Sequence, residues 1–247
     1  MSELTYEQAP VPVRDALTAA HRRAWARLAA PGTWLTGAER TAIMAEVRHV
    51  PQCALCRQQK AALSPYAIDG AHNHLGALPE VQVDVIHRVI SDPGRLTPDW
   101  FASVTGDRLS VERYVETIGV LAQTVAIDTF ARGIGQDPLP LPKPVAGEPS
   151  GYRPEGIRQE EAWVPWLTPE TVNEAERQLM PRDRPVANIR RAMSLVPAEA
   201  LGFFDIVEAQ YLAGREMRDF EHEFRAINHA QIELVAGRVS ALNGCVY

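Results

Sequence analysis

Apolar residues recur through the first half of the chain at the three- and four-residue spacing of amphipathic helices. Thr36 and Glu39 match a capping box, so a helix is predicted to follow Thr36. A second helix is predicted to stop at Asp92-Pro93-Gly94, and Ser110 is predicted to cap a third. The apolar faces of the three are Ile43, Met44 and Val47; Val81, Val85, Ile86, Val89 and Ile90; and Tyr114, Ile118, Leu121, Val125 and Phe130.

The last third of the chain has the same helical periodicity. It predicts helices over residues 185–193, 201–213 and 220–241, and no segment alternates as a half-buried strand would. The predicted fold class is therefore all-α.

A proline-rich segment separates these two groups of helices. It begins with Asp137-Pro138-Leu139-Pro140-Leu141-Pro142-Lys143-Pro144 and continues through Pro149 and Pro154. Proline fixes φ and removes an amide donor, so neither a helix nor a central strand is expected there. We predict a semi-rigid linker over 138–159, between a front unit (1–137) and a rear unit (160–247).

Composition and charge exclude several classes of function. The 247 residues carry a net charge of -6, which argues against a nucleic-acid-binding protein because those usually present a basic face. No apolar run approaches the roughly 20 residues that span a bilayer, and the acidic start Met1 to Glu7 does not resemble a signal peptide. We therefore expect a cytoplasmic protein, in which a Cys-x-x-Cys pair is more often catalytic or metal-binding than a structural disulfide.

The three cysteines carry the candidate chemistry. Cys53 and Cys56 form a Cys-x-x-Cys pair, and Cys245 lies twelve positions after Glu233 near the other end of the chain. The amides and dipole at a helix start stabilise a thiolate, which can attack a peroxide and then be resolved by a neighbouring thiol. Aligning Cys53 with Cys245 also superposes the small and apolar positions of the preceding helices, which predicts a tandem duplication.

The stretch Glu233-x11-Cys245-Val246-Tyr247 resembles the AhpD-like alkylhydroperoxidase and carboxymuconolactone decarboxylase superfamily. Residues 91–97 and 114–120 are similar to the helices downstream of that superfamily's dithiol, and residues 188–195 to the lead-in helices of its peroxidase-related members. The resemblance implies two AhpD-like helical units, the second incomplete, that form homo-oligomers. It also implies a hydroperoxide substrate and a dithiol electron donor of the thioredoxin or lipoyl type. We expect no cofactor and no metal.

By the same resemblance the second cysteine of the pair is the nucleophile, the first resolves it, and a Glu–His pair moves protons. This makes Cys56 the nucleophile and Cys53 the resolving thiol, whereas helix-start physics alone favours Cys53. The front unit has Lys60 where the resemblance expects histidine and Thr41 where it expects glutamate. Lys60 is a candidate site residue because its charge can lower the pKa of a nearby thiol, but it is a poor proton donor unless burial lowers its own pKa. The groups that could replace the expected histidine and glutamate stay open; they are Glu46 with His49, or His72, His74 and His87.

In the rear unit Glu233 and Cys245 are the expected site residues, and the position after Tyr247 is where the resemblance places the peroxidatic thiol. Our hypothesis is a selenocysteine codon read there as a stop, and a boundary set by cloning or a natural end are the alternatives. A selenol is a stronger peroxide nucleophile than a thiol, so this unit would hold the stronger of the two sites.

Three other interpretations compete with a peroxidase. Structural zinc at Cys53 and Cys56 is less favoured, because the sequence shows no second Cys-x-x-Cys and no histidine pair at zinc-finger spacing. A decarboxylase-like lyase conflicts with the cysteine pair, which such members of the superfamily lack. A non-catalytic scaffold is favoured only by Lys60 and Thr41.

Overall fold

The computed structural model describes residues 5–170, 172–180 and 186–245. These residues are mostly helical, as the all-α prediction requires, with one antiparallel pair of two-residue strands. The chain divides into two compact units, residues 1–206 and 207–247. The predicted linker at 138–159 thus lies inside the first unit, and the tandem duplication stays a prediction. Pro185, where one helix was expected to begin, and Val246 and Tyr247 of the C-terminal motif lie outside the described residues.

The first unit contains most of the helices. The α-helices are α1 (Asp15–Ala29), α2 (Gly37–His49), α3 (Ala54–Ala61), α4 (Glu80–Ser91), α5 (Pro98–Val104), α6 (Val111–Gly133), α7 (Asn188–Arg191) and α8 (Pro197–Gln210), whose last residues belong to the second unit. The 3-10 helices are η1 (Val50–Gln52), η2 (Pro65–Ala67), η3 (Pro93–Arg95) and η4 (Glu176–Gln178). Strand β1 (Ile157–Arg158) pairs with β2 (Trp166–Leu167).

Local sequence explains where the central helices begin and end. Thr36 accepts a hydrogen bond from the amide of Glu39, and Glu39 bonds back to the Thr36 amide, so the predicted capping box is confirmed. Ser110 caps α6 in the same way through the amide of Arg113. Helix α4 ends at Ser91, immediately before the predicted stop at Asp92-Pro93.

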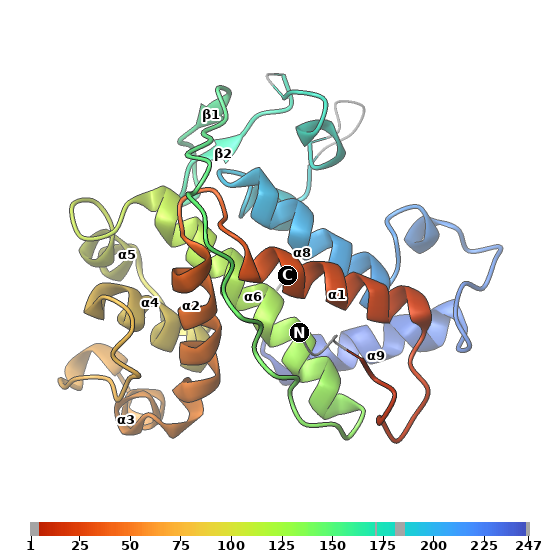
Figure 1. The fold of residues 1–247 in the computed structure, drawn as a ribbon, viewed down its shortest axis with the longest axis horizontal. Coiled ribbons are helices and arrows are strands. Elements are labelled where there is room, and N and C mark those ends of the chain that lie inside the picture. Colours follow the sequence, from red (N-terminus) through yellow and green to blue (C-terminus); the bar gives the residue numbers. More distant parts are fainter. Residues whose placement is uncertain (1–4, 171, 181–185, 246–247) are drawn as a thin grey trace. The chain divides into compact units, whose positions relative to one another are not determined.

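Helix α2 packs against α1, α4 and α6, and α4 also packs against α3 (Figure 1). Two faces of α4 contribute to two different apolar clusters. Val83 and Ile86 join the cluster that also contains both front cysteines, and Val81 and Val85 join the cluster around Trp100. Helix α4 is therefore fixed in position from both sides.

The proline-rich segment follows the surface of the first unit without helix or strand from 136 to 154 (Figure 1). Several of its backbone groups bond to the helical part of the unit. The Trp25 indole donates to the carbonyl of Pro140 (3.0 Å), and the Val145 amide donates to the carbonyl of Ala29 (2.8 Å). Leu139 is buried in the first apolar cluster. The absence of regular structure here follows from the prolines, as predicted.

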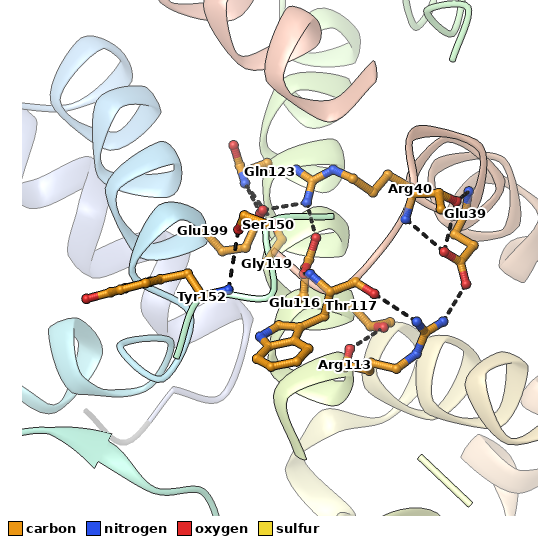
Figure 2. A network of polar contacts seen from close by, with 12 residues as sticks. Glu39, Arg40, Arg113, Glu116, Thr117, Gly119, Gln123, Ser150, Tyr152 and Glu199 are labelled. Carbon is orange, nitrogen blue, oxygen red and sulfur yellow. Dashed lines mark hydrogen bonds and ion pairs between the residues drawn. The ribbon is translucent and has the colours of Figure 1, made fainter. Parts of the chain in front are cut away.

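A buried ion cluster joins α2, α6 and α8 within the first unit (Figure 2). Arg40 Nη1 lies 2.5 Å from Glu116 Oε1 and 2.6 Å from Glu199 Oε1, and the three side chains are 3%, 0% and 4% exposed. Burial and the neighbouring Glu199 raise the pKa of Glu116, although Arg40 opposes that effect. One guanidinium thus compensates two carboxylates that water cannot reach.

Glycines provide the space for this cluster. A Cβ on Gly32 would lie 1.9 Å from Glu116 Oε1, and a Cβ on Gly119 would lie 2.5 Å from the Glu199 Cβ. Any side chain at either position would displace a carboxylate from Arg40. The close approach of α8 to α6 therefore depends on Gly119.

The second unit contains η5 (Glu216–Arg218), α9 (His229–Leu242) and the end of α8. Asn228 and Gln231 form a capping box that starts α9, and Arg225 donates to the carbonyl of Tyr211 (2.8 Å). The predicted helix over 220–241 is therefore found only from His229 onward. Glu233 on α9 accepts a hydrogen bond from the Tyr211 hydroxyl.

Replacing Arg40 tests the ion cluster. Arg40→Met is expected to destabilise the protein by about 3–5 kcal/mol, because two buried carboxylates lose the cation that they share. Arg23→Met is the matched control: Arg23 is 55% exposed, and its partner Asp205 keeps Arg27 at 3.1 Å, so the expected cost is about 1 kcal/mol or less. Urea unfolding followed by circular dichroism measures both, and equal losses would contradict the role given to Arg40.

Candidate functional site

Both front cysteines lie at the N-terminal end of α3. Cys53 is the N-cap residue and Cys56 is in the first turn. Helix α2 ends at His49 and the 3-10 turn η1 connects it to α3, so both cysteines lie where the amides of a helix start have no intrahelical partner. Cys53 is 0% and Cys56 3% exposed, and both are free thiols. The pair is thus a buried dithiol at a helix start.

Two histidines from other elements meet the dithiol. His72 lies in the connection between η2 and α4, and its Nδ1 is 3.6 Å from Cys53 Sγ and 3.5 Å from Cys56 Sγ. His87 lies on α4, and its Nδ1 is 3.2 Å from Cys56 Sγ. The two imidazole rings are 4.4 Å apart between centroids. Cys56 therefore contacts two imidazoles, and Cys53 contacts one.

Each histidine bonds to a carboxylate through Nε2, the ring nitrogen that faces away from the sulfurs. His87 Nε2 is 2.9 Å from Glu46 Oε1 on α2, and the other Glu46 oxygen accepts from the Leu75 amide (3.0 Å). His72 Nε2 is 3.1 Å from Asp84 Oδ1 on α4. A carboxylate can only accept here, so Nε2 carries the hydrogen in both rings and Nδ1 faces the sulfurs.

Asp84 is itself oriented by a further hydrogen bond. The Trp100 indole of α5 donates to Asp84 Oδ2 at 2.9 Å. The sulfurs, the imidazoles and the carboxylates thus form one connected set contributed by α2, α3, α4, α5 and the connection before α4.

This set changes the ionisation of its members. Burial alone would raise the pKa of Cys56, but the hydrogen bonds with His72 and His87 outweigh it and lower the pKa to about 6. Burial opposes protonation of His72, yet Asp84 and the two sulfurs raise its pKa to about 10. The pKa of His87 is also raised, because Cys56 and Glu46 outweigh burial. At neutral pH the arrangement stabilises a Cys56 thiolate beside a cationic imidazole.

The same atoms form a potential metal-ligand set. One donor atom from each of Cys53, Cys56, His72 and His87 lies within 4.8 Å of every other. Among the described residues this is the group of four histidine and cysteine donors that could hold a metal ion.

The structure places the predicted site residues in three different settings. Cys53 and Cys56 form the centre of the site, and of the open alternatives it brings Glu46, His72 and His87 to them. Lys60 is exposed on α3, and His49 and His74 bond instead to Asn73 and to the Gly76 amide. Glu233 and Cys245 are exposed residues of the second unit, on α9 and just after it.

Sequence reasoning missed Asp84 and Trp100. One local signal pointed to Asp84: the Asp84-x-x-His87 spacing places both residues on one helix face, although in the structure Asp84 pairs with His72.

Comparison of the chain with protein-family models, curated proteins and solved structures gives no match. The resemblance to the AhpD-like superfamily therefore rests on the quoted residues alone. Among the described residues, no helix is long and apolar enough to cross a lipid bilayer.

The lowered pKa of Cys56 gives a direct spectroscopic prediction. In reduced, chelator-treated Cys245→Ser protein, thiolate absorbance in the far ultraviolet should rise through a transition near pH 6, well below the value of about 8.5 for an ordinary thiol. The sign follows from the contacts: hydrogen bonds from imidazole stabilise the ionised sulfur, so the thiolate persists to lower pH.

Cys56→Ser should remove this transition, and His74→Ala should leave it in place, because the His74 ring accepts from the Gly76 amide in its own turn. A single transition near pH 8.5 in the parent protein would show that the histidines do not activate the thiol.

Proposed function

We propose that the chain is a thiol-dependent peroxidase that reduces hydrogen peroxide or alkyl hydroperoxides, with Cys56 as nucleophile and Cys53 as resolving thiol. The observation that carries the proposal is a buried line of three groups. Cys56 Sγ lies 3.2 Å from His87 Nδ1, and His87 Nε2 lies 2.9 Å from Glu46 Oε1. A nucleophile, an acid–base group and the carboxylate that orients it are the parts that such a reaction needs.

The contacts support Cys56 rather than Cys53 as nucleophile. Two imidazoles contact Cys56, whereas Cys53 contacts only His72. This agrees with the role implied by the AhpD-like resemblance. Glu46 with His87 takes the place of the Glu–His pair, for which the front unit has Thr41 and Lys60 at the expected positions.

In the first step the Cys56 thiolate attacks the terminal oxygen of the hydroperoxide. A sulfur–oxygen bond forms, the oxygen–oxygen bond breaks, and the departing alkoxide takes a proton from His87. Glu46 accepts the hydrogen bond of the remaining His87 N–H and so stabilises the imidazolium before the transfer. The products are an alcohol, or water when the substrate is hydrogen peroxide, and Cys56 sulfenic acid.

In the second step the Cys53 sulfur attacks the sulfur of the sulfenic acid. A disulfide forms and the hydroxyl group leaves as water, taking a proton from the site. An external dithiol of the thioredoxin or lipoyl type then reduces the disulfide by exchange, which completes a two-electron cycle. This cycle needs both thiols, whereas a decarboxylase-like lyase does not.

Cysteine substitutions test the two roles separately. In metal-free Cys245→Ser protein supplied with a dithiol, Cys56→Ser should abolish peroxide consumption, because the nucleophile is lost. Cys53→Ser should still form a sulfenic acid that dimedone traps, but it should not form the intramolecular disulfide. Peroxide consumption by Cys56→Ser equal to that of the parent would refute the proposal and favour a scaffold role.

Glu46→Gln tests the carboxylate behind His87. Gln has nearly the same shape but no charge to stabilise the imidazolium, so the rate constant of Cys56 oxidation should fall about 10²-fold, within the range for lost acid–base assistance. Stopped-flow peroxide reduction measures it, with circular dichroism as a check on folding. Gln58→Ala, an exposed change on α3, is the control and should retain the parent rate.

A further inference from the structure

The four side chains around the dithiol have the composition of a zinc-binding site. Two thiols and two imidazoles are a common ligand set for structural Zn²⁺. In the sequence the ligands follow the pattern Cys-x2-Cys-x15-His-x14-His, in which the histidines are too far apart for zinc-finger spacing. Tertiary packing brings them together, with His87 on α4 and His72 in the connection before it.

The distances fit a tetrahedral centre. Zinc lies about 2.3 Å from sulfur and 2.0–2.1 Å from nitrogen, which at tetrahedral angles places sulfur and nitrogen ligands about 3.5 Å apart. Three of the four sulfur–nitrogen distances are 3.6, 3.5 and 3.2 Å, and all four ligand atoms lie within 4.8 Å of one another. A metal ion at the centre therefore requires little movement of the side chains.

The outer hydrogen bonds fit as well. Histidines that bind a metal usually donate their other N–H to a carboxylate, which fixes the tautomer. His72 does this with Asp84 and His87 with Glu46, so both rings direct Nδ1 toward the centre. The second pair, His72 with Asp84, supplies the fourth donor of a complete ligand set, because His72 Nδ1 lies at nearly the same distance from both sulfurs.

We infer that the reduced site binds one Zn²⁺ through Cys53 Sγ, Cys56 Sγ, His72 Nδ1 and His87 Nδ1. All four ligands come from the protein and are largely buried, so the centre has no open position for a substrate, as in structural zinc sites. The ion replaces the protons that the thiols and imidazoles otherwise share.

One consequence rests on the proposed function: zinc occupies the lone pairs of the nucleophile, so the metal-bound form reacts slowly with peroxide. When peroxide does oxidise the two thiolates, two electrons pass to one peroxide. Its oxygen–oxygen bond breaks, two protons from solvent complete the alcohol and water products, and a disulfide forms. The disulfide no longer binds Zn²⁺, which leaves. The fraction of protein that holds Zn²⁺ therefore determines how much of it reacts quickly with peroxide.

The metal site is tested on reduced, chelator-stripped Cys245→Ser protein. Zn²⁺ should bind at one equivalent per chain in equilibrium dialysis, and Co²⁺ should give the intense visible bands of tetrahedral coordination with thiolate charge-transfer bands. His72→Ala should lose the tetrahedral Co²⁺ spectrum, whereas His74→Ala in the same loop should keep it. Asp84→Asn should retain one equivalent but bind Zn²⁺ about 10–100-fold more weakly, as for other lost outer-shell partners.

The metal site and the peroxidase activity can each fail while the other stands. Substoichiometric zinc, or a Co²⁺ spectrum unchanged by His72→Ala, would overturn the metal site even if metal-free protein consumes peroxide. Stoichiometric zinc with no peroxide consumption by the metal-free protein would overturn the proposed peroxidase and leave the metal site. His72→Ala keeps Cys56, His87 and Glu46, so it should still reduce peroxide. His72→Ala also loses one of the two imidazole contacts of Cys56, so each protein is compared with its own metal-free rate: adding Zn²⁺ should slow the parent protein relative to that rate and leave the rate of His72→Ala unchanged.

Discussion

Helix α2 places two charged side chains in the interior, and both must find partners there. Arg40 pairs with two carboxylates from α6 and α8, and Glu46, further along the same helix, pairs with His87 and with the Leu75 amide. A buried charge without partners costs several kcal/mol, so these contacts restrict where the neighbouring elements can pack. Glu46 in this way fixes both α4 and the connection that carries His72.

The two charged centres differ in their chemistry: one is an ion cluster, and the other includes a sulfur. The Arg40 cluster carries two anions on one cation and is sealed by glycine backbones, so its role is structural. The Glu46 centre ends at a sulfur, a group that can change its oxidation state or bind a metal. The same helix thus holds one rigid anchor and one reactive site. Because α4 packs on both apolar clusters, the position of His87 relative to Cys56 depends on the whole first unit.

Sequence reasoning succeeded where the determining interactions are local. The caps at Thr36 and Ser110 and the stop after Ser91 involve residues within a few positions of each other. It could not choose among the histidines, because His72 and His87 lie 16 and 31 residues from Cys56 and reach it only through tertiary packing. A zinc site was also disfavoured from the sequence, because the sequence does not show that these two histidines meet the cysteines. In the second unit the predicted helix began too early, because Asn228 and Gln231 form a capping box just before His229 and start α9 there.

The hydrogen bond from the Leu75 amide to Glu46 bears on which residues a search for related chains should require. Glu46 uses only the backbone of residue 75, whose side chain is 52% exposed, so almost any residue other than proline can stand there. Glu46 itself cannot be replaced as freely, since both its side-chain oxygens are hydrogen-bonded inside the protein. We expect divergent relatives to retain Glu-x6-Cys-x2-Cys and two distant histidines while the loop sequence between them changes. A search built on that sparse pattern suits this chain better than one built on overall similarity.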